Sequence, residues 1–598
     1  MLVANKQKIV IIGAGACGLV AALLAKQCNL EVCIVEKNTS EHYHGHAHFL
    51  NATGLDILAT VGVSIADLAK YATPMPQAST MIYGLDLQHT LAKLNLWDDG
   101  SYREAFMHTG RWGLSMNVDY TILRAKLLEL IESTDIELLW EHELQALDLQ
   151  AQQACIQTPS QFIKLDWDYL LACDGANSTL ANLLGVDHLL DQHLKTFLCC
   201  DLNVDISPYA RDKALLYWLY NPEIRCCVVA HDLSRHIVLQ IPLANQYESI
   251  DDYPDQRIKN CLQAICGEGS EKLTAEVRHK RIWKMRSRLL ATMQQERVFI
   301  LGDAAHSMTP AGGLGLNTAI ADAYNLIWKI ASGNTPLLNS YTQERLDVAR
   351  QACENSIANY EDFLSVPKAL GVPMQLADLP AAIDYYTKDF LPQPLHRKLS
   401  KVAAQPLEWI YHYSQMDHQL AQQTRSRVQA ALAGNALHFS GVEQHRPAIY
   451  RSVAIDTDAM NYDDRQKESP RLGQKLLYTH YSSAMVAAAP IHSVYPNWLA
   501  IIAANNSPWL VTTAKLGIHT VEVDCLLTPK IQLLAHTHPI AKTSEDRADR
   551  KYVLAKDMLI LLRPDMVVAF KRSHTSFNVR SLEDWMKKVG YTPTLDSQ

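Results

Sequence analysis

The chain has 598 residues, and its 55 Lys plus Arg against 63 Asp plus Glu give a formal net charge of -8 at pH 7. A chain this long holds about two to four domains, and an acidic balance without a basic run disfavours a nucleic-acid partner. Its 13 cysteines include no CxxC pair, which favours reduced thiols and a cytoplasmic protein. Its 24 histidines form no HExxH motif, so we expect no metal. The alternate spacing of His42, His44, His46 and His48 leaves a metal-binding stripe as an alternative.

The first elements predict a nucleotide-binding turn. A buried strand at 8–12 precedes a helix at 19–25, and between them lie Gly13, Ala14, Gly15, Ala16, Cys17 and Gly18. Gly13 and Gly15 let the backbone approach a pyrophosphate, and Gly18 lets the helix pack against the strand. A second strand at 31–35 ends in Glu36, where a carboxylate meets a ribose 2′-hydroxyl. Because an acid there disfavours a 2′-phosphate, the turn predicts FAD or NAD.

The same run has an alternative interpretation. Residues 9–25 are weakly polar behind Lys6 and Lys8, as in a signal peptide or a short membrane span. The run is short for a span, however, and glycines fill its centre. Glu36 fits only a nucleotide, so we expect no membrane segment here.

Strands and helices alternate up to about residue 185. A helix is predicted at 120–131, a strand at 136–140, and a strand at 167–173 that leads into Asp174 and Gly175. Between 187 and 283 the pattern changes to short alternating strands at 214–220, 226–230 and 237–241. These predict an antiparallel sheet.

A second glycine-rich segment follows the buried strand at 298–301. Asp303 comes directly after that strand and suits a carboxylate that accepts a hydrogen bond from a ribitol hydroxyl. Pro310 and the glycines at 312, 313 and 315 leave backbone amides bare, and they open a helix from Leu316 to about 331. The positive end of such a helix stabilises the negative charge of a reduced flavin. The two distant segments therefore predict one flavin site.

The remaining pattern predicts an α/β fold of several domains. Helices are expected at 341–363 and 396–432, separated by a proline-rich connector, and strands at 498–504, 509–513 and 558–570. We expect a Rossmann-like FAD-binding domain in two parts, 1–185 and 285–365, interrupted by an antiparallel-sheet substrate domain at 186–284. A helical connector at 366–435 and a C-terminal domain at 436–598 complete the chain.

The sequences VFILGDAAH at 298–306, GGLGLNT at 312–318 and NLIWK at 325–329 closely resemble class A FAD-dependent aromatic hydroxylases. These are the flavoprotein monooxygenases related to phenol and para-hydroxybenzoate hydroxylases. The DG pair at 174–175, AHFLN at 47–51 and WKM at 283–285 extend the resemblance over roughly residues 7 to 365. RPD at 563–565 is similar to an element in the thioredoxin-like C-terminal domain of larger members. Because Cys525 is the only cysteine after Cys353, we expect that domain to be structural or to support a homodimer.

The resemblance implies that NADH or NADPH reduces FAD and that O2 attacks the reduced ring. A flavin C4a-hydroperoxide then hydroxylates a phenolic or polycyclic aromatic small molecule. The residues that match the family's cofactor-binding motifs are Gly13, Gly15, Ala16, Cys17, Gly18, Glu36, Lys37, His46, Arg124, Asp174, Gly175, Asp303, Pro310, Gly313, Gly315, Leu316 and Asn317.

The sequence departs from the family's pattern at three arginine positions. His46, Tyr120 and Ala181 stand where arginine is usual, while Arg124 matches a second arginine of the same helix. Arginine holds phosphate through two hydrogen bonds and histidine does not, so we expect FAD to be lost more readily than in related enzymes. Arg103 and Arg111 are candidate substitutes. The alternative is ordinary divergence, with FAD held by the amides of the glycine turns.

The substrate pocket is expected between the flavin ring and the antiparallel sheet. Candidates by position are Tyr217, Trp218, Arg225, His231, Gln240 and Met308, each with packing as the alternative role. Tyr217 or His231 is the candidate catalytic base, whereas the resemblance makes His306 a structural neighbour of the flavin. Two competing functions are a halogenase, whose WxWxIP element is absent, and a flavin-binding protein without hydroxylase activity, such as an NAD(P)H oxidase or an interaction protein.

Overall fold

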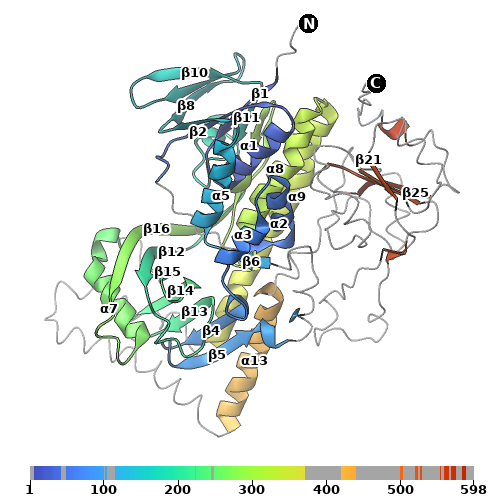
Figure 1. Cartoon of the computed structure of the whole chain (residues 1–598). Helices are drawn as coiled ribbons and strands as arrows, with labels where there is room; N and C mark the ends of the chain where they lie inside the picture. The colour runs from blue at the N-terminus through green and yellow to red at the C-terminus, as the bar shows by residue number, and fades with distance from the viewer. Residues whose placement is uncertain are drawn as a thin grey trace.

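The computed structural model describes residues 6–41, 49–99, 102–103, 115–221, 224–243, 248–370 and 419–439, together with short segments between 455 and 586. Figure 1 shows a sheet with helices at the top of the molecule and a second sheet below it. Towards the C-terminus, a smaller four-stranded sheet lies beside the long helices. The protein is therefore a mixed α/β protein with several sheets.

The upper sheet has six strands in the order β17-β18-β11-β1-β2-β7. All neighbours are parallel except β17, which pairs with β18 in the antiparallel sense. Its strands are β1 (Lys8–Ile12), β2 (Glu31–Glu36), β7 (Glu137–Trp140), β11 (Tyr169–Ala172), β17 (Gln294–Gln295) and β18 (Val298–Ile300). The strands that precede the two glycine-rich segments, β1 and β18, both pair with β11. Because the carboxyl ends of parallel strands meet at one edge of a sheet, both segments emerge at the same edge.

Three helices pack together beside this sheet. They are α1 (Ala16–Gln27), α5 (Tyr120–Glu132) and α8 (Leu314–Ala331), and α1 contacts both of the others. Their apolar side chains and those of β1 and β2 form one core with exposures near zero. The strands are nearly continuous apolar runs because both of their faces are buried.

The lower sheet has eight strands in the order β19-β16-β12-β15-β14-β13-β4-β5. Its pairs are antiparallel except β13 with β4. The strands are β4 (Thr80–Gly84), β5 (Thr90–Asn95), β12 (His188–Val204), β13 (Leu216–Tyr220), β14 (Arg225–Asp232), β15 (His236–Pro242), β16 (Ala275–Leu290) and β19 (His306–Ser307). Helix α7 (Asp255–Cys266) covers one face. Residues 1–185 thus contribute strands to both large sheets.

Smaller elements surround the two sheets. They are β3 (Phe49–Asn51), β6 (Ser115–Asn117), β8 (Glu143–Asp148), β9 (Gln153–Gln157), β10 (Phe162–Asp166), α2 (Ala52–Thr60), α3 (Ile65–Leu68) and α6 (Thr179–Leu184). The long helix α9 (Thr335–Ala369) packs against α8 and against α13 (Gln419–Phe439). Helix α9 extends beyond the predicted 341–363.

The described C-terminal strands are β20 (Leu499–Ile502), β21 (His519–Glu522), β22 (Leu526–Leu527), β23 (Tyr552–Val553), β24 (Met558–Leu562) and β25 (Val568–Ser573). Four of them form the sheet β21-β20-β24-β25. The predicted strand at 558–570 is thus an antiparallel pair, β24 and β25. Residues 396–418 of the second predicted helix and the strand expected at 509–513 lie outside the described residues.

A buried ion pair joins this C-terminal sheet to the long helices. The Arg563 guanidinium lies directly after β24 and donates to both carboxylate oxygens of Glu344 on α9, at 2.6 and 2.9 Å. Glu344 also accepts hydrogen bonds from Asn325 and Lys329 of α8, at 2.8 and 3.0 Å. The arginine of the RPD sequence is therefore a docking residue, fully buried against the FAD-side helices.

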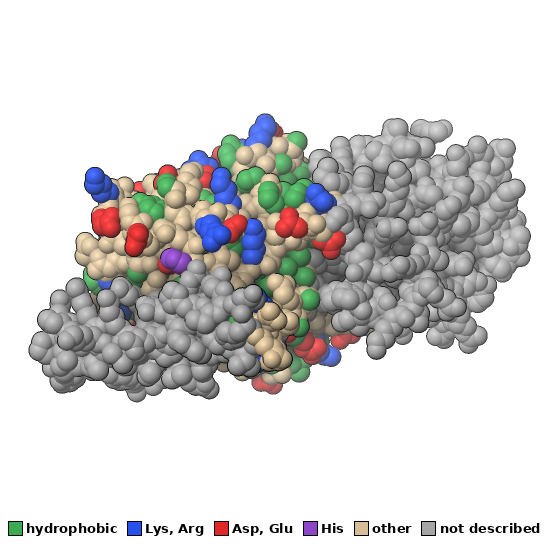
Figure 2. Space-filling model, turned by 90° about the horizontal axis from the view of Figure 1, so that it is seen from below, with side chains coloured by type: hydrophobic (Ala, Val, Ile, Leu, Met, Phe, Trp, Pro, Cys, Tyr) green, Lys and Arg blue, Asp and Glu red, His purple; other side chains and the backbone are tan. Residues whose placement is uncertain are grey.

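The described surface carries charged side chains of both signs. Figure 2 shows a face on which the described Lys, Arg, Asp and Glu side chains are interspersed, with no patch of one sign. Within the described ranges, no helix has both the length and the apolar character needed to cross a membrane.

Candidate flavin and substrate site

A cavity of about 1000 Å³ lies between the two large sheets. Both glycine-rich segments line it, and so does the face of the lower sheet that α7 leaves uncovered. Of the predicted site residues, the cavity is lined by Gly13, Gly15, Ala16, Cys17, Glu36, Lys37, Asp174, Gly175, His231, Asp303, Pro310, Gly313, Gly315 and Leu316. The folded chain therefore brings together residues up to about 300 positions apart in one cavity.

The first glycine turn combines close packing with an open face. Gly13 has a φ of +107°, and a Cβ there would lie 2.3 Å from the carbonyl oxygen of Cys173. A Cβ on Gly18 would lie 2.0 Å from the carbonyl oxygen of Gly13. At Gly15 the nearest atom to such a Cβ is the Tyr120 hydroxyl at 3.8 Å, so this position faces open space. Gly13 and Gly18 are needed for packing, whereas Gly15 leaves room for a ligand.

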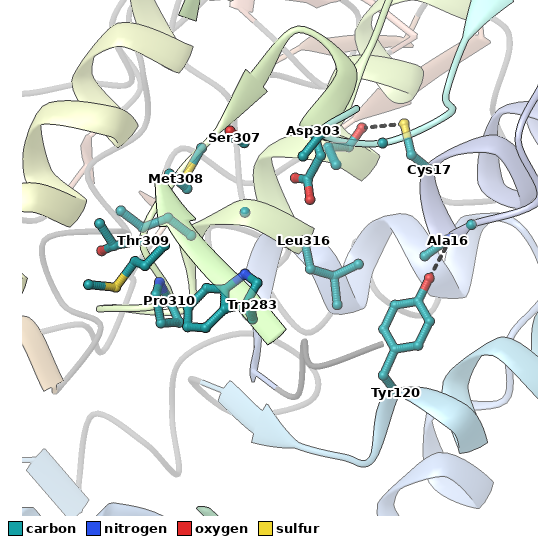
Figure 3. A pocket seen from close by; sticks show the side chains of 18 of the residues that line it. Ala16, Cys17, Tyr120, Trp283, Asp303, Ser307, Met308, Thr309, Pro310 and Leu316 are labelled. Carbon is teal, nitrogen blue, oxygen red and sulfur yellow. Dashed lines mark hydrogen bonds between the residues drawn. The ribbon is translucent and has the colours of Figure 1, made fainter. Parts of the chain in front are cut away.

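Tyr120 contacts the first turn of α1 directly. Its hydroxyl oxygen accepts a hydrogen bond of 2.7 Å from the backbone N–H of Ala16, as Figure 3 shows. Amides at this end of a helix are the groups that bind a phosphate. The residue that replaces an expected arginine thus lines the cavity beside the first glycine turn. Its aromatic type and its place at the start of α5 were visible in the sequence, but the direction of its side chain was not.

Glu36 and its neighbours form another end of the cavity. One carboxylate oxygen of Glu36 accepts a hydrogen bond from the Ala14 amide at 2.8 Å. The other accepts from the amide and side chain of Asn38, at 2.9 and 2.7 Å. Lys37 also lines the cavity. This places the carboxylate at the end of β2, where a ribose hydroxyl is expected.

The basic residues predicted near the phosphates lie elsewhere or outside the described residues. Arg124 is 6% exposed, donates to the carbonyl oxygens of Ala14 and Ser40 at 3.4 and 3.2 Å, and does not line the cavity. Arg124 therefore stabilises the first glycine turn on the side away from the cavity. Arg103 is exposed and also does not line the cavity. His46 and Arg111 lie outside the described residues, together with the histidine stripe at 42–48.

Two aspartates with unusual surroundings face the cavity. One oxygen of Asp174 accepts a hydrogen bond from the Leu180 amide at 3.2 Å, while the other, Oδ1, is buried without a partner among the described residues. Burial raises the pKa of Asp174. Asp303 is open to the cavity but enclosed by the surrounding chain, and this desolvation raises its pKa as well. An unsatisfied carboxylate oxygen beside bare amides fits a ligand rich in hydroxyl groups.

The second glycine segment is held by its neighbours from behind. Asn317 does not line the cavity. Its side chain donates to the carbonyl oxygens of Phe49 and Gly313, at 3.0 and 2.8 Å, and accepts from the Asn51 amide at 3.0 Å. It therefore ties the start of α8 to β3. Gly18 is also absent from the lining because α1 packs there.

A buried charge network lies directly behind Asp303. Asp322 accepts hydrogen bonds from the Gly302 amide at 3.0 Å, from His306 at 2.7 Å and from Arg345 at 2.6 Å. Burial alone would raise the pKa of Asp322, but the charges of Arg345 and His306 lower it. His306 is fully buried and does not line the cavity, so it supports the turn and does not face a ligand.

The substrate half of the cavity has an aromatic wall. The ring centroids of Trp218 and Phe363 lie 5.9 Å apart, and the Phe197 ring stacks on that of Trp283 with 5.7 Å between the centroids. Figure 3 shows Trp283, Met308, Thr309 and Pro310 on the side opposite Tyr120, with Leu316 and Asp303 between them. Of the candidates by position, Trp218, His231, Gln240 and Met308 line the cavity and Arg225 does not. The motif containing Trp283 was recognised in the sequence, but not its place in this wall.

Tyr217 lies on the other face of its strand. Its side chain is fully buried in the core beneath α7, where its hydroxyl donates to the Asp212 carbonyl oxygen and accepts from the Ala214 amide, both at 2.8 Å. Burial raises the pKa of this phenol well above its ordinary value. It does not line the cavity, so the geometry argues against the prediction that Tyr217 is a base.

The comparisons with known proteins agree with this geometry. A family described as FAD binding domain matches residues 6–356, more than half of the chain. A 2,4-dichlorophenol 6-monooxygenase of Delftia acidovorans is 21% identical over 75% of each chain. A p-hydroxybenzoate hydroxylase of Acinetobacter baylyi is 24% identical over 60% of this chain and 84% of its own. The crystal structure of the flavin-dependent monooxygenase PieE in complex with FAD and substrate has a TM-score of 0.78 at 19% identity, covering 98% of this chain and 100% of that one.

The chain belongs to the FAD binding domain family. The resemblance to class A FAD-dependent aromatic hydroxylases that the sequence predicted is confirmed, and so is FAD as the cofactor. The residues present fit that cofactor: the Gly15 position is open, the Gly175 position has no atom near a would-be Cβ, and Asp174 Oδ1 is a buried acceptor facing the cavity.

Proposed function

We propose that the protein is an FAD-dependent monooxygenase that uses NADH or NADPH and O2 to hydroxylate a phenolic or polycyclic aromatic small molecule. The observation that carries this proposal is the one cavity that joins both glycine-rich segments to an aromatic wall. Hydroxylation by a flavin requires the ring and the substrate in the same water-poor space. The relatives that act on dichlorophenol and hydroxybenzoate support the same reaction class.

When bound, FAD supplies the reaction with O2, and the chain's own residues bind and orient its parts. Gly15, Ala16 and Cys17 of the first glycine turn line the cavity at the expected pyrophosphate position, and Glu36 lines it at the expected ribose position. Asp303 and the amides at the start of α8 face the flavin end of the cavity. Helix α8 directs its positive end there, which favours a negative charge on a bound ring.

The aromatic wall supports a planar substrate. Trp218 and Trp283 present large rings from β13 and β16, and Phe363 and Phe197, which also line the cavity, pack against them. Such rings bury the faces of an aromatic molecule and exclude water from it. Gln240 and His231 are among the polar groups that the lower sheet adds to the cavity, which also include Arg281, Lys284, Arg286 and Arg288 of β16.

The test uses the full-length protein with FAD. NADH and NADPH oxidation, O2 uptake and product formation are measured with p-hydroxybenzoate, 2,4-dichlorophenol and a panel of polycyclic phenols. We expect a phenol to stimulate oxidation and to gain one oxygen atom, labelled when the reaction is run in ¹⁸O2. Yellow protein that hydroxylates nothing in the panel would instead favour a flavin-binding protein without hydroxylase activity.

A matched pair of variants separates the wall from the cofactor. Trp218→Leu removes a ring from the cavity, and we expect about a tenfold loss of substrate affinity with unchanged FAD affinity. Phe162→Leu is the control, because Phe162 is 64% exposed on β10 and does not line the cavity. Equal effects of the two changes on hydroxylation would count against this wall as the substrate site.

We also propose the division of the chain expected from its sequence. It consists of FAD-binding parts at 1–185 and 285–365, a substrate domain at 186–284, a connector at 366–435 and a thioredoxin-like domain at 436–598. The buried contact between Arg563 and Glu344 supports a structural role for the last of these. A homodimer and a cytoplasmic location belong to the same proposal, and gel filtration with light scattering tests the dimer.

A further inference from the structure

Two histidines stand side by side at one end of the substrate wall. His231 is near the end of β14 and His236 begins β15. The pairing steps from Ala230 with Ile237 to Asp232 with His236, so His231 occupies a β-bulge. The two rings stack at 5.0 Å with an angle of 22° between their planes. Because a bulge changes the direction of a side chain, it allows His231 to face the cavity while remaining in contact with His236.

His236 is held between two carboxylates. Its Nδ1 lies 3.0 Å from an oxygen of Asp119, and its Nε2 lies 2.9 Å from an oxygen of Asp201. Both ring nitrogens donate a hydrogen bond only when the imidazole carries two protons. Burial of the ring opposes the charge, but the two aspartates outweigh burial and raise the pKa of His236 to about 9. His236 is therefore a fixed cation at neutral pH.

The same contact reaches the cofactor half of the cavity. Asp119 precedes α5, and its other oxygen accepts a hydrogen bond from the Thr121 amide at 2.9 Å, capping that helix. The next residue, Tyr120, accepts the hydrogen bond from Ala16 in the glycine turn. A short path therefore connects His231 to the phosphate end through His236, Asp119 and Tyr120.

We propose that His236 is a positioning residue: held between Asp119 and Asp201, it keeps the His231 imidazole uncharged and fixed in the wall, ready to accept the proton of a phenolic hydroxyl. This inference rests on the proposed hydroxylase function. A positive charge stacked against His231 disfavours a second charge there, and the uncharged imidazole is the form that accepts a proton. Removing the hydroxyl proton makes the phenol ring of the substrate more electron-rich, which favours its attack on an electrophilic oxygen. His231 would be the catalytic residue, and His236 acts only through it.

Other charged groups surround this end of the sheet. Asp232 and Arg235 pair with each other at 2.8 Å in the turn between β14 and β15. His279 on β16 lies opposite Asp201 in the register. These groups remain in place in His236→Gln. A change in the titration midpoint of His231 in that variant therefore reports the loss of the His236 charge.

The direct test is an NMR titration of ¹⁵N-histidine-labelled full-length holoprotein from about pH 5 to about pH 10. His231→Gln and His236→Gln identify the two signals. We expect His236 to keep both protons at neutral pH and to lose one near pH 9. In His236→Gln the titration midpoint of His231 rises by roughly one pH unit. A neutral His236 at pH 7, or a His231 midpoint that does not move, overturns the proposal.

Two further variants serve as an alternative test and as a control. Asp201→Asn keeps the ring and removes one anchor, so we expect the titration midpoint of His236 to fall, which tests the anchoring if His236→Gln does not fold. His89→Gln is the matched control: His89 is exposed, its Nδ1 lies 2.9 Å from an oxygen of Asp86, and it does not line the cavity. We expect it to leave the His231 midpoint unchanged.

Activity supplies an independent measurement. With a phenol hydroxylated by the wild-type protein, His236→Gln lowers kcat at neutral pH at least about tenfold and moves the acid limb of kcat/KM to higher pH. FAD content stays unchanged. If the wild-type protein hydroxylates no phenol but His231 shifts as expected, the proposed function fails and the histidine pairing stands. If hydroxylation occurs and His231 does not shift, only the present inference fails.

Discussion

The two halves of the cavity are built from different parts of the chain. The cofactor half presents backbone turns and the amides of helix ends, while the substrate half presents side chains that stand on β-strands. A turn that depends on missing Cβ atoms at Gly13 and Gly18 tolerates few changes at these positions, because a side chain on either one meets backbone. A wall of side chains can change its shape while the sheet beneath it keeps its register. The cofactor half therefore fixes which cofactor binds, and the substrate half can be altered to select the substrate.

The largest effect expected from this difference is at Gly18. In Gly18→Ala the new Cβ would lie 2.0 Å from the Gly13 carbonyl oxygen, so strand and helix must separate. We expect a loss of about 3 kcal/mol or more in the free energy of unfolding together with loss of FAD binding. Chemical denaturation and flavin fluorescence measure the two quantities.

Gly15→Ala is the matched control at the open face of the same turn. Its Cβ meets nothing closer than the Tyr120 hydroxyl at 3.8 Å, so the apoprotein keeps its stability. The added methyl group instead occupies the space of the pyrophosphate and weakens FAD binding. Equal stability losses in Gly15→Ala and Gly18→Ala would show that the turn does not divide its glycines between packing and ligand.

The next largest effect concerns the buried charges behind the cofactor half. Arg563→Ala removes the guanidinium that donates to both carboxylate oxygens of the buried Glu344, and we expect a loss of about 3 kcal/mol in the free energy of unfolding. Arg350→Ala on α9 is the control: its pair with Asp347 is exposed, so the expected loss is below about 0.5 kcal/mol. Similar midpoints of urea unfolding for both variants would contradict the docking role of Arg563.

The cofactor half was predictable from sequence for a physical reason. Its glycines, Glu36 and Asp303 sit at fixed offsets from buried strands, and parallel strands deliver their carboxyl ends to one edge of a sheet. The substrate half is different because a strand alternates its side chains between two faces. Tyr217 and Trp218 are neighbours and cannot both face the cavity, and only the position of α7 decides between them. The sequence also gave no sign that β4 pairs with β13 across more than a hundred residues.

A pH effect of intermediate size distinguishes the wall from the rest of the protein. The folded pKa of His236 is about 9 against an ordinary value of 6.5. A raised pKa adds stability that is fully present below pH 6.5 and is lost as pH rises through 9. We expect the free energy of unfolding of the wild-type protein to be about 2 kcal/mol larger than that of His236→Gln at low pH. This difference disappears above pH 9. Thermal unfolding of both proteins across this range measures it, and a difference that is constant with pH would exclude the charge as its source.

The smallest expected effect is at Tyr120, whose hydroxyl contacts the Ala16 amide at the start of α1. Tyr120→Phe removes the acceptor of the Ala16 hydrogen bond and leaves the ring in place. We expect a cost of about 1 kcal/mol, or roughly a fivefold rise in the Kd for FAD, from loss of a polar group that orients this amide. Tyr71→Phe, at a half-exposed ring, is the control. Tyr120→Arg is expected to have the opposite effect, because an arginine that hydrogen-bonds to the phosphates tightens FAD binding. An unchanged affinity would show that this arginine does not contribute to holding the pyrophosphate.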